Sequence, residues 1–256
     1  MATVLLERPT EHIALLRLNR PDARNALNSE LRSLLSKYFL KLNDETAVRC
    51  IVITGGSDVF AAGADLKEIV EADSIEMMQR RILYFWKTIS SCTKPIIAAV
   101  NGAALGGGCE LALNADIIIA GESAKFGQTE VCVGVMPGGG GTQRLVRAIG
   151  KYRAMKMMMT GEIILAPEAL TMGFISEITP DEKVLSTALI MAEKIAQMPP
   201  LAIMQIKEVV TAGADAPLDT GLMLERKAFE LLFSSKDQKE GMNAFIEKRK
   251  PKFTGQ

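Results

Sequence analysis

Two glycine-rich runs near the middle of the chain constrain its fold more than any other feature. Residues 101–113 and 126–144 together hold 10 of the 21 glycines in the 256-residue sequence. Ordering glycine costs more backbone entropy than ordering any other residue, so such density is typical of places where the backbone takes positive φ values or closely approaches another group. Each run also contains one carboxylate, Glu110 in the first and Glu130 in the second. The runs therefore predict a site where exposed peptide groups and two glutamates meet.

Short apolar, β-branched runs alternate with amphipathic segments through the first 180 residues. The apolar runs are typical of strands buried on both faces of a sheet, and the alternation predicts α/β units with right-handed crossovers. Asn28 or Ser29 can cap the first helix, and Asp65 can cap one that begins at Leu66. Strands are expected at 3–7, 13–18, 50–54, 94–100, 116–120 and 174–178, and helices at 30–42, 74–90, 105–114, 142–149, 151–160 and 165–173.

The chain beyond Pro180 is predicted to be helical throughout. Helices are expected at 183–197, 200–211, 219–234 and 236–247, with a break at Met198-Pro-Pro. A helical tail that exposes apolar faces packs on its own core or on another subunit. We therefore expect a core of residues 1–198 that carries the site, and a helical region of residues 199–256 that serves oligomerisation.

The overall charge and hydropathy exclude several classes of protein. Thirty basic residues balance 30 acidic ones, so no net field favours nucleic acid or an anionic membrane, and we expect neither as a partner. No apolar run approaches the roughly 18 residues of a membrane span, and the first residues lack a signal-peptide pattern. These features predict a soluble, cytoplasmic protein.

The cysteines and the histidine limit the candidate chemistry. Cys50, Cys92, Cys109 and Cys132 lie in mostly apolar surroundings without CxxC spacing, which predicts buried, reduced thiols and no metal site. His12 is the single histidine and lies in an alternating stretch, so we expect a strand or surface residue. A catalytic triad would need that histidine, which leaves carboxylates as the candidate acids and bases.

The predicted helix at 105–114 begins with three glycines that leave its first amides unshielded. A helix N-terminus carries unpaired N–H groups and about half a positive charge, so an oxygen that gains negative charge is stabilised there. If the amides of the turn at Gly63-Ala64 lie opposite, the two sets of donors form an oxyanion hole. Glu110 lies three residues after Gly107 and projects from the same face of the helix.

Glu130 follows Thr129 and precedes Val131, a partly apolar setting that predicts a raised pKa. Two such carboxylates around one water molecule can deliver a hydroxyl and a proton to a double bond. Taken singly, each glutamate also fits an ordinary surface residue. The apolar residues around Glu110 favour the functional interpretation when the two are considered together. For Arg20, Arg24 and Asn25, a solvated loop and a role in holding an anionic ligand are equally open.

At these residues the sequence resembles the crotonase, or enoyl-CoA hydratase, family over essentially its whole length. The resemblance implies an α/β fold built as a crotonase-like spiral of ββα units with a helical C-terminal region, assembled as a homotrimer or a homohexamer (a dimer of trimers). It is nearest to bacterial hydratases of fatty-acid and phenylacetate breakdown, including those acting on 2,3-dehydroadipyl-CoA. It rests on NRPDARNAL at 19–27, FAAGADL at 60–66, KPIIAAVNG at 94–102, GGGCELA at 106–112, FGQTE at 126–130 and FIEKRKPKF at 245–253.

The resemblance also implies roles for individual residues. Glu110 and Glu130 match the catalytic glutamates of the hydratases, and Ala64 and Gly107 match the residues whose amides hold the thioester oxygen. No metal or redox cofactor is implied, because the oxyanion hole stabilises the enolate-like charge that forms when water adds to the β-carbon. The substrate is carried as a coenzyme A thioester. One departure is Thr129, where many hydratases have proline, which affects the expected pocket shape. Residues that match the CoA-lining region are Arg24, Ala26, Ala62, Asp65, Leu66 and Lys67, with Lys248 or Lys250 expected to reach a phosphate.

The resemblance leaves two alternatives to hydration of a trans-2-enoyl-CoA. One is an enoyl-CoA isomerase of the same fold, which typically keeps only one of the two glutamates. The other is a non-catalytic relative that binds CoA or RNA, against which the balanced charge argues in the case of RNA. For the acyl group, pocket lining and simple core packing are both open for Met77, Met78, Leu83, Trp86 and Met136.

Overall fold

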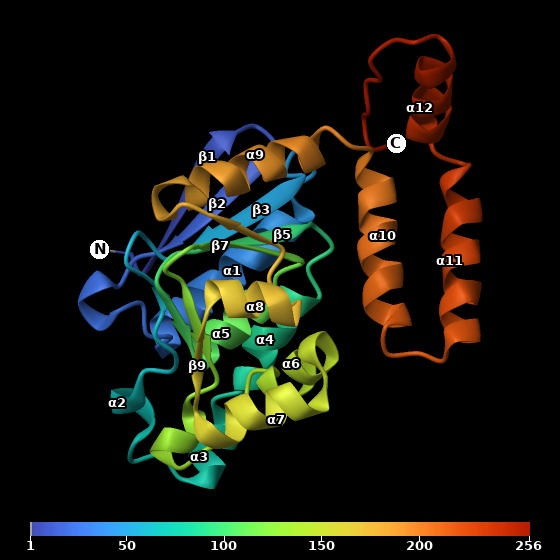
Figure 1. Cartoon of the computed structure of the whole chain (residues 1–256). Coiled ribbons are helices and arrows are strands. Elements are labelled where there is room, and N and C mark those ends of the chain that lie inside the picture. The colour runs from blue at the N-terminus through green and yellow to red at the C-terminus, as the bar shows by residue number, and fades with distance from the viewer. Residues whose placement is uncertain (1) are drawn as a thin grey trace.

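A computed structural model describes residues 2–256, and its largest element is a six-stranded sheet in the order β1-β2-β3-β5-β7-β10 (Figure 1). β1 and β2 form an antiparallel hairpin, and the remaining neighbours pair in parallel. The parallel pairing follows from the helical crossovers that the alternating sequence predicts. The strands are β1 (Val4–Thr10), β2 (Ile13–Leu18), β3 (Cys50–Thr54), β5 (Ile96–Val100), β7 (Ile117–Gly121) and β10 (Glu177–Thr179).

A second sheet of four strands, in the order β4-β6-β8-β9, was not predicted from the sequence. Each strand has three residues, which is too short to show an alternating pattern. β3, β5 and β7 are each followed by a strand of this second sheet and then by helical segments, which confirms the expected spiral of ββα units. The strands are β4 (Val59–Ala61), β6 (Ala103–Leu105), β8 (Lys125–Gly127) and β9 (Ile163–Leu165).

The helices agree with the sequence expectations except at two places. The predicted helix at 74–90 is two helices, because Arg81 adopts a left-handed conformation (φ 48°) that interrupts it. Asp65 precedes α2 but its side chain makes no cap hydrogen bond, whereas Asn28, one of the two predicted candidates, caps α1. The helices are α1 (Ser29–Asp44), α2 (Leu66–Ile69), α3 (Ser74–Gln79), α4 (Ile82–Ser90), α5 (Gly107–Leu113), α6 (Gly141–Ile149), α7 (Lys151–Thr160), α8 (Ala166–Met172), α9 (Val184–Ala196), α10 (Pro200–Gly213), α11 (Leu218–Leu232) and α12 (Lys236–Ile246), with 3-10 turns at Pro21–Ala23, Glu130–Val133 and Asp181–Lys183.

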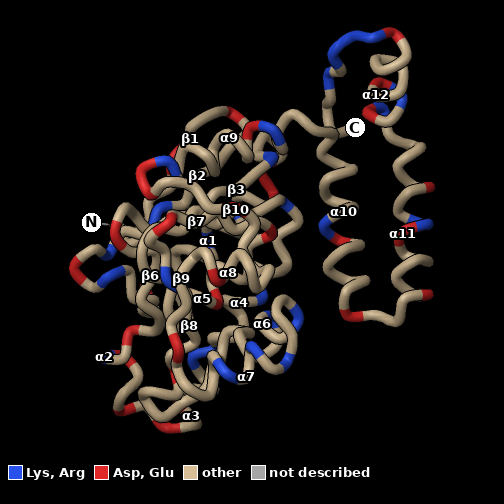
Figure 2. The backbone as a smooth tube through the Cα atoms, viewed as in Figure 1, with Lys and Arg blue, Asp and Glu red and all other residues tan. Residues whose placement is uncertain are grey.

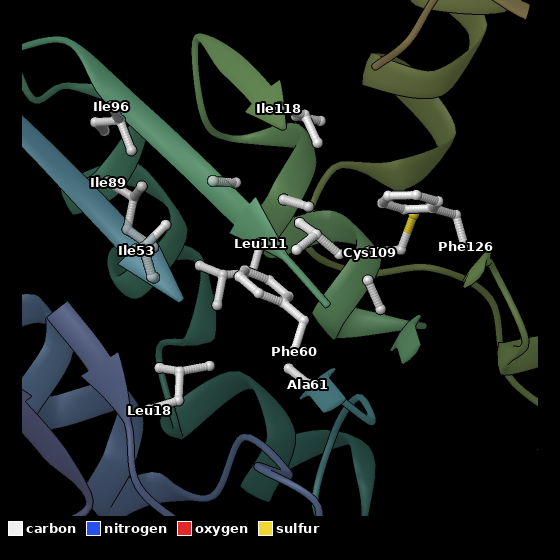
Figure 3. Packing of buried hydrophobic residues seen from close by; sticks show 14 of the residues in the cluster. Leu18, Ile53, Phe60, Ala61, Ile89, Ile96, Cys109, Leu111, Ile118 and Phe126 are labelled. Carbon is white, nitrogen blue, oxygen red and sulfur yellow. The ribbon is translucent and has the colours of Figure 1, made fainter. Parts of the chain in front are cut away.

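The six-stranded sheet is buried on both faces, as its apolar strands predict. On one face Cys50 and Val52 pack under α9, and on the other Ile51 and Ile53 join the main core with residues of α1, α4 and α5. Figure 3 shows part of this main core, in which Phe60 reaches from the second sheet into the packing. The two sheets and the first turn of α5 therefore share one core.

Two local expectations need correction. The last strand lies at 177–179 instead of 174–178, because Phe174 and Ile175 pack into the main core ahead of it. Cys132 is exposed, so the prediction of buried thiols is wrong there, although it is confirmed for the other three cysteines. Cys132 lies in the 3-10 turn at Glu130–Val133, which the apolar sequence around it did not reveal.

Helices α10, α11 and α12 lie to one side of the sheets (Figure 1). Polar contacts join this region to the rest of the chain. Lys207 forms an ion pair with Asp116 at 2.7 Å and donates to the carbonyl oxygen of Lys94 at 2.9 Å, Arg147 forms an ion pair with Asp215, and Arg49 donates to the carbonyl oxygen of Phe253 at 3.0 Å. No residue of α10 or α11 is buried in this chain. The first half of α10, residues 200–206, carries no charged residue (Figure 2). Within residues 2–256, no helix has the length and apolar character needed to cross a membrane.

We expect Asn25→Asp to lower the free energy of unfolding by roughly 3 kcal/mol, because a buried donor is replaced by a charged acceptor. Asn25 is 2% exposed and has a left-handed backbone (φ 55°) that aspartate also tolerates. Its side-chain amide donates to the carbonyl oxygens of Gly55, Val59 and Phe60 at 3.1–3.2 Å. Asn25 is therefore a structural residue of the loop.

Urea unfolding measures this effect, with Asn19→Asp as the matched control. Within residues 2–256, the side-chain amide of Asn19 donates one hydrogen bond, to the carbonyl oxygen of Ala2 at the surface, so its replacement is expected to cost much less. Equal losses in the two variants would contradict the role assigned to Asn25.

Candidate active site

The two glycine-rich runs and the α3–α4 segment enclose one cavity of about 520 Å³. It opens between the second sheet, the first turn of α5 and helix α4. Both predicted glutamates and both predicted amide donors line it. The lining residues are Leu27, Arg32, Ala62, Gly63, Ala64, Leu66, Ile69, Met77, Met78, Arg81, Ile82, Leu83, Trp86, Gly106, Gly107, Glu110, Thr129, Glu130, Val133, Val135, Met136, Gly138 and Gly139.

Glu110 lies in the first turn of α5 and is only 3% exposed. One of its carboxylate oxygens, Oε1, accepts hydrogen bonds from the backbone amides of Gly139 and Gly141, at 2.6 and 2.8 Å. Burial raises the pKa of Glu110, while these amides and the charge of Arg144 oppose that rise. The two hydrogen bonds from these backbone amides fix the orientation of the Glu110 carboxylate and favour its ionised form.

Glu130 begins the 3-10 turn after β8 and has a different environment. Its Oε2 is buried and has no hydrogen-bond partner within residues 2–256. Burial raises the pKa of Glu130 to about 7, and the nearby charge of Glu110 adds to the effect. A carboxyl group with this pKa is populated in both protonation states near neutral pH, which suits proton transfer.

The amides of Ala64 and Gly107 lie close together at the wall of the same cavity. A Cβ built on Gly107 would be 3.7 Å from the Ala64 nitrogen, and a Cβ built on Gly63 would be 3.6 Å from the Gly107 nitrogen. The Gly107 amide belongs to the first turn of α5, where no acceptor exists within the helix. The arrangement has the components of an oxyanion hole.

Glycine is required where α5 meets β4 and where Glu130 meets α5. A Cβ on Gly108 would lie 2.0 Å from the carbonyl oxygen of Ala61, so only a residue without a side chain allows this contact. Gly106 has a positive φ of 50°, and a Cβ there would lie 3.2 Å from Oε1 of Glu130. These close approaches explain the glycine density of the first run.

Two of the predicted CoA-lining residues line the cavity, and the other four lie outside its lining. Ala62 and Leu66 line the cavity, and Arg24 lies beside them because its carbonyl oxygen accepts from the Ala62 amide at 3.0 Å. Asp65 forms an ion pair with Arg20 at 3.0 Å, and Arg20 also donates to the carbonyl oxygen of Ala26. Lys67 lies in α2 and is exposed, outside the cavity lining.

Lys248 and Lys250 follow α12 and do not line this cavity in the same chain. Lys250 instead lines a separate surface depression formed by the end of the chain, with Lys236 and Arg249. A single chain therefore does not bring the two lysines to the predicted CoA site. Their predicted contact with a phosphate stays a prediction.

Several lining residues were missed or left open by the sequence. The amides of Gly139 and Gly141 that orient Glu110 come from the four-glycine run at 138–141, whose density was the available signal. Arg32 and Arg81 gave no such signal, since each resembles a solvated helix residue. The five residues for which pocket lining and core packing were both open all line the cavity: Met77, Met78, Leu83, Trp86 and Met136.

Comparisons with known proteins show which family the chain resembles in sequence and in fold. The sequence model described as Enoyl-CoA hydratase/isomerase matches residues 8–256. The chain is 43% identical to the 2,3-dehydroadipyl-CoA hydratase of Escherichia coli K12, covering 100% of both, and 47% identical to a probable mitochondrial enoyl-CoA hydratase of Dictyostelium discoideum, covering 93% of this chain and 86% of the relative. The crystal structure of an enoyl-CoA hydratase from Bacillus anthracis superposes with a TM-score of 0.95 at 37% identity, covering 99% of this chain and 100% of that one.

The α/β fold, the spiral of ββα units and the match over nearly the whole length lead to one conclusion. The chain belongs to the enoyl-CoA hydratase/isomerase family and has the crotonase fold.

Proposed function

We propose that the protein is an enoyl-CoA hydratase, which adds water across the 2,3 double bond of a trans-2-enoyl-CoA to give a 3-hydroxyacyl-CoA. The observation that carries the proposal is the position of Glu110 and Glu130 on one cavity beside the amides of Ala64 and Gly107. The names of the relatives at 43–47% identity support the same activity.

The different environments of the two glutamates suggest their roles. The ionised carboxylate of Glu110 takes a proton from water as the water oxygen bonds to C3 of the substrate. Glu130 in its protonated form donates a proton to C2, and the double-bond electron pair forms the new C2–H bond. Both side chains approach from the cavity side of the substrate, so the addition is syn. Exchange of one proton with solvent restores the starting state.

The thioester oxygen gains negative charge as water adds to C3. The amides of Ala64 and Gly107 would donate to that oxygen, and loss of one such donor typically costs roughly 3 to 4 kcal/mol of transition-state stabilisation. Addition of water involves no net oxidation or reduction, and the proposed acid, base and donors are all groups of the chain. The mechanism therefore uses neither a metal nor a redox cofactor.

The CoA portion of the substrate would lie along the residues that match the CoA-lining region: Arg24, Ala26, Ala62, Asp65, Leu66 and Lys67. Ala62 and Leu66 line the cavity, and the Arg20–Asp65 ion pair joins the two segments that carry this set. Lys248 or Lys250 would have to come from a neighbouring subunit to reach a phosphate. The unburied apolar side chains of α10 and α11 support assembly into a homotrimer or homohexamer.

Glu110→Gln and Glu130→Gln are each expected to lower kcat by roughly 10² to 10⁴, because each removes one proton-transfer group without changing side-chain volume. Hydration of crotonyl-CoA is followed by loss of the absorbance of the conjugated thioester, and circular dichroism checks the fold. Glu122→Gln is the matched control, since Glu122 is exposed and outside the cavity.

Full activity in either active-site variant would disprove the assigned roles. An isomerised enoyl-CoA in place of a 3-hydroxyacyl product would identify an isomerase, and binding of CoA without turnover would identify a non-catalytic relative.

The pH dependence of kcat/KM is expected to show a decline above about pH 7, because hydration needs the protonated form of Glu130, whose pKa burial raises to about 7. Dehydration is the reverse reaction, and it also needs one proton on the two glutamates together. We therefore expect kcat/KM for 3-hydroxybutyryl-CoA to decline over the same pH range. A flat profile between about pH 6 and about pH 8, roughly one pH unit either side of the pKa of Glu130, would contradict the assignment.

Protein stability gives an independent measure of the same shift. The raised pKa means that folding disfavours the ionised form of Glu130, so wild-type stability falls as pH rises from the ordinary value of 4.5 towards about 7. Glu130→Gln lacks this titration, and its stability relative to wild type is therefore expected to increase over that pH range and to level off above it.

A further inference from the structure

Arg81 is a charged group of the cavity that the proposed hydration does not use. The other charged residues of the lining all have an assigned partner or role: Glu110 and Glu130 carry the chemistry, and Arg32 donates to the carbonyl oxygen of Leu27 and to Ser29 Oγ. Arg81 lines the cavity and is exposed to solvent, and its side chain forms no hydrogen bond or ion pair with any residue between 2 and 256. Its guanidinium is therefore available to a ligand.

The backbone at Arg81 presents this side chain from an apolar wall. Arg81 joins α3 to α4 in a left-handed conformation (φ 48°), which glycine or asparagine adopts more easily than arginine. Met77, Met78, Ile82 and Leu83 precede and follow it and line the same cavity. Arg81 is thus the one charged residue among the apolar residues that this segment contributes to the cavity lining.

The direction of α4 relates Arg81 to the reacting carbons. Trp86 of α4 lies near Glu110, because a Cβ on Gly139 would come within 2.3 Å of Trp86 and 2.6 Å of Glu110 Oε2. Ile82 is four residues earlier, about 6 Å of helix rise. The segment that holds the amide of Ala64, residues 62–66, is a different wall of the cavity. Along α4, the cavity therefore extends from the double-bond site towards Arg81.

We infer that the acyl group of the substrate ends in a carboxylate, and that Arg81 binds it. The inference rests on the proposed hydratase function and defines its substrate class: trans-2-enoyl-CoA thioesters of short dicarboxylic acids. A guanidinium presents paired N–H donors that match the two oxygens of a carboxylate. A chain that ends in a methyl group offers no acceptor to Arg81.

The test compares two six-carbon substrates, trans-2-hexenoyl-CoA and the trans-2-enoyl-CoA with a terminal carboxylate. The measured quantity is the ratio of kcat/KM for the carboxylate substrate to kcat/KM for hexenoyl-CoA. Arg81→Met is expected to lower this ratio roughly tenfold, the low end for a hydrogen-bonded charged group near solvent. Arg81→Lys should retain part of the preference, since it keeps the charge and loses the paired donors.

Arg153→Met is the matched control, because Arg153 is exposed on α7 and does not line the cavity. Its ratio should equal that of wild type. An unchanged ratio in Arg81→Met would overturn the inference, and so would an equal loss for both substrates, which would place Arg81 at the phosphates of CoA. If wild type hydrates hexenoyl-CoA in these experiments, the hydratase function stands; if it hydrates neither substrate, both proposals fail.

Discussion

The contact between the backbone of α5 and strand β4 is the constraint on which the rest of the site depends. Gly108 lies so close to the Ala61 carbonyl that any side chain would collide with it. This approach brings the first amide of α5 next to the amide of Ala64 and directs Glu110 into the cavity. If α5 lay a few ångströms farther from β4, the amides of Ala64 and Gly107 would be too far apart to bind one oxygen. The strands of the second sheet have only three residues each, too few to compensate for such a shift.

The two glutamates show how one cavity produces different carboxyl groups. Both are removed from water, which raises the pKa of each. Glu110 receives two amide hydrogen bonds from the four-glycine loop, whereas Glu130 has a buried oxygen without a partner within the described residues. The two glutamates therefore differ more in hydrogen bonding than in burial. Glu110 is oriented as a carboxylate, whereas Glu130 exchanges its proton near neutral pH.

The cavity wall formed by α3 and α4 depends on an irregularity in the backbone. A continuous helix over residues 74–90 would carry its apolar side chains in one stripe towards the core. The left-handed residue Arg81 divides the segment, so that Phe85 and Trp86 remain in the core, with Trp86 also at the cavity, while Met77 and Met78 line the cavity. The same residue that breaks the helix also supplies a charge to the wall.

The sequence alone determined the α/β class, the buried strand at 50–54, the next strand except for its exact start at Ile96, and the first helix with Asn28 or Ser29 as its cap. These features depend on local composition and periodicity. It also predicted that Glu110, Glu130 and the glycine-rich runs meet, through charge in apolar surroundings and through family motifs, and both glutamates line one cavity. Only the tertiary structure decided the second sheet, the hydrogen bonds from Gly139 and Gly141 to Glu110, and the place of Arg81 on the cavity. Those features arise from contacts between segments far apart in the chain, which leave no periodic pattern in either segment.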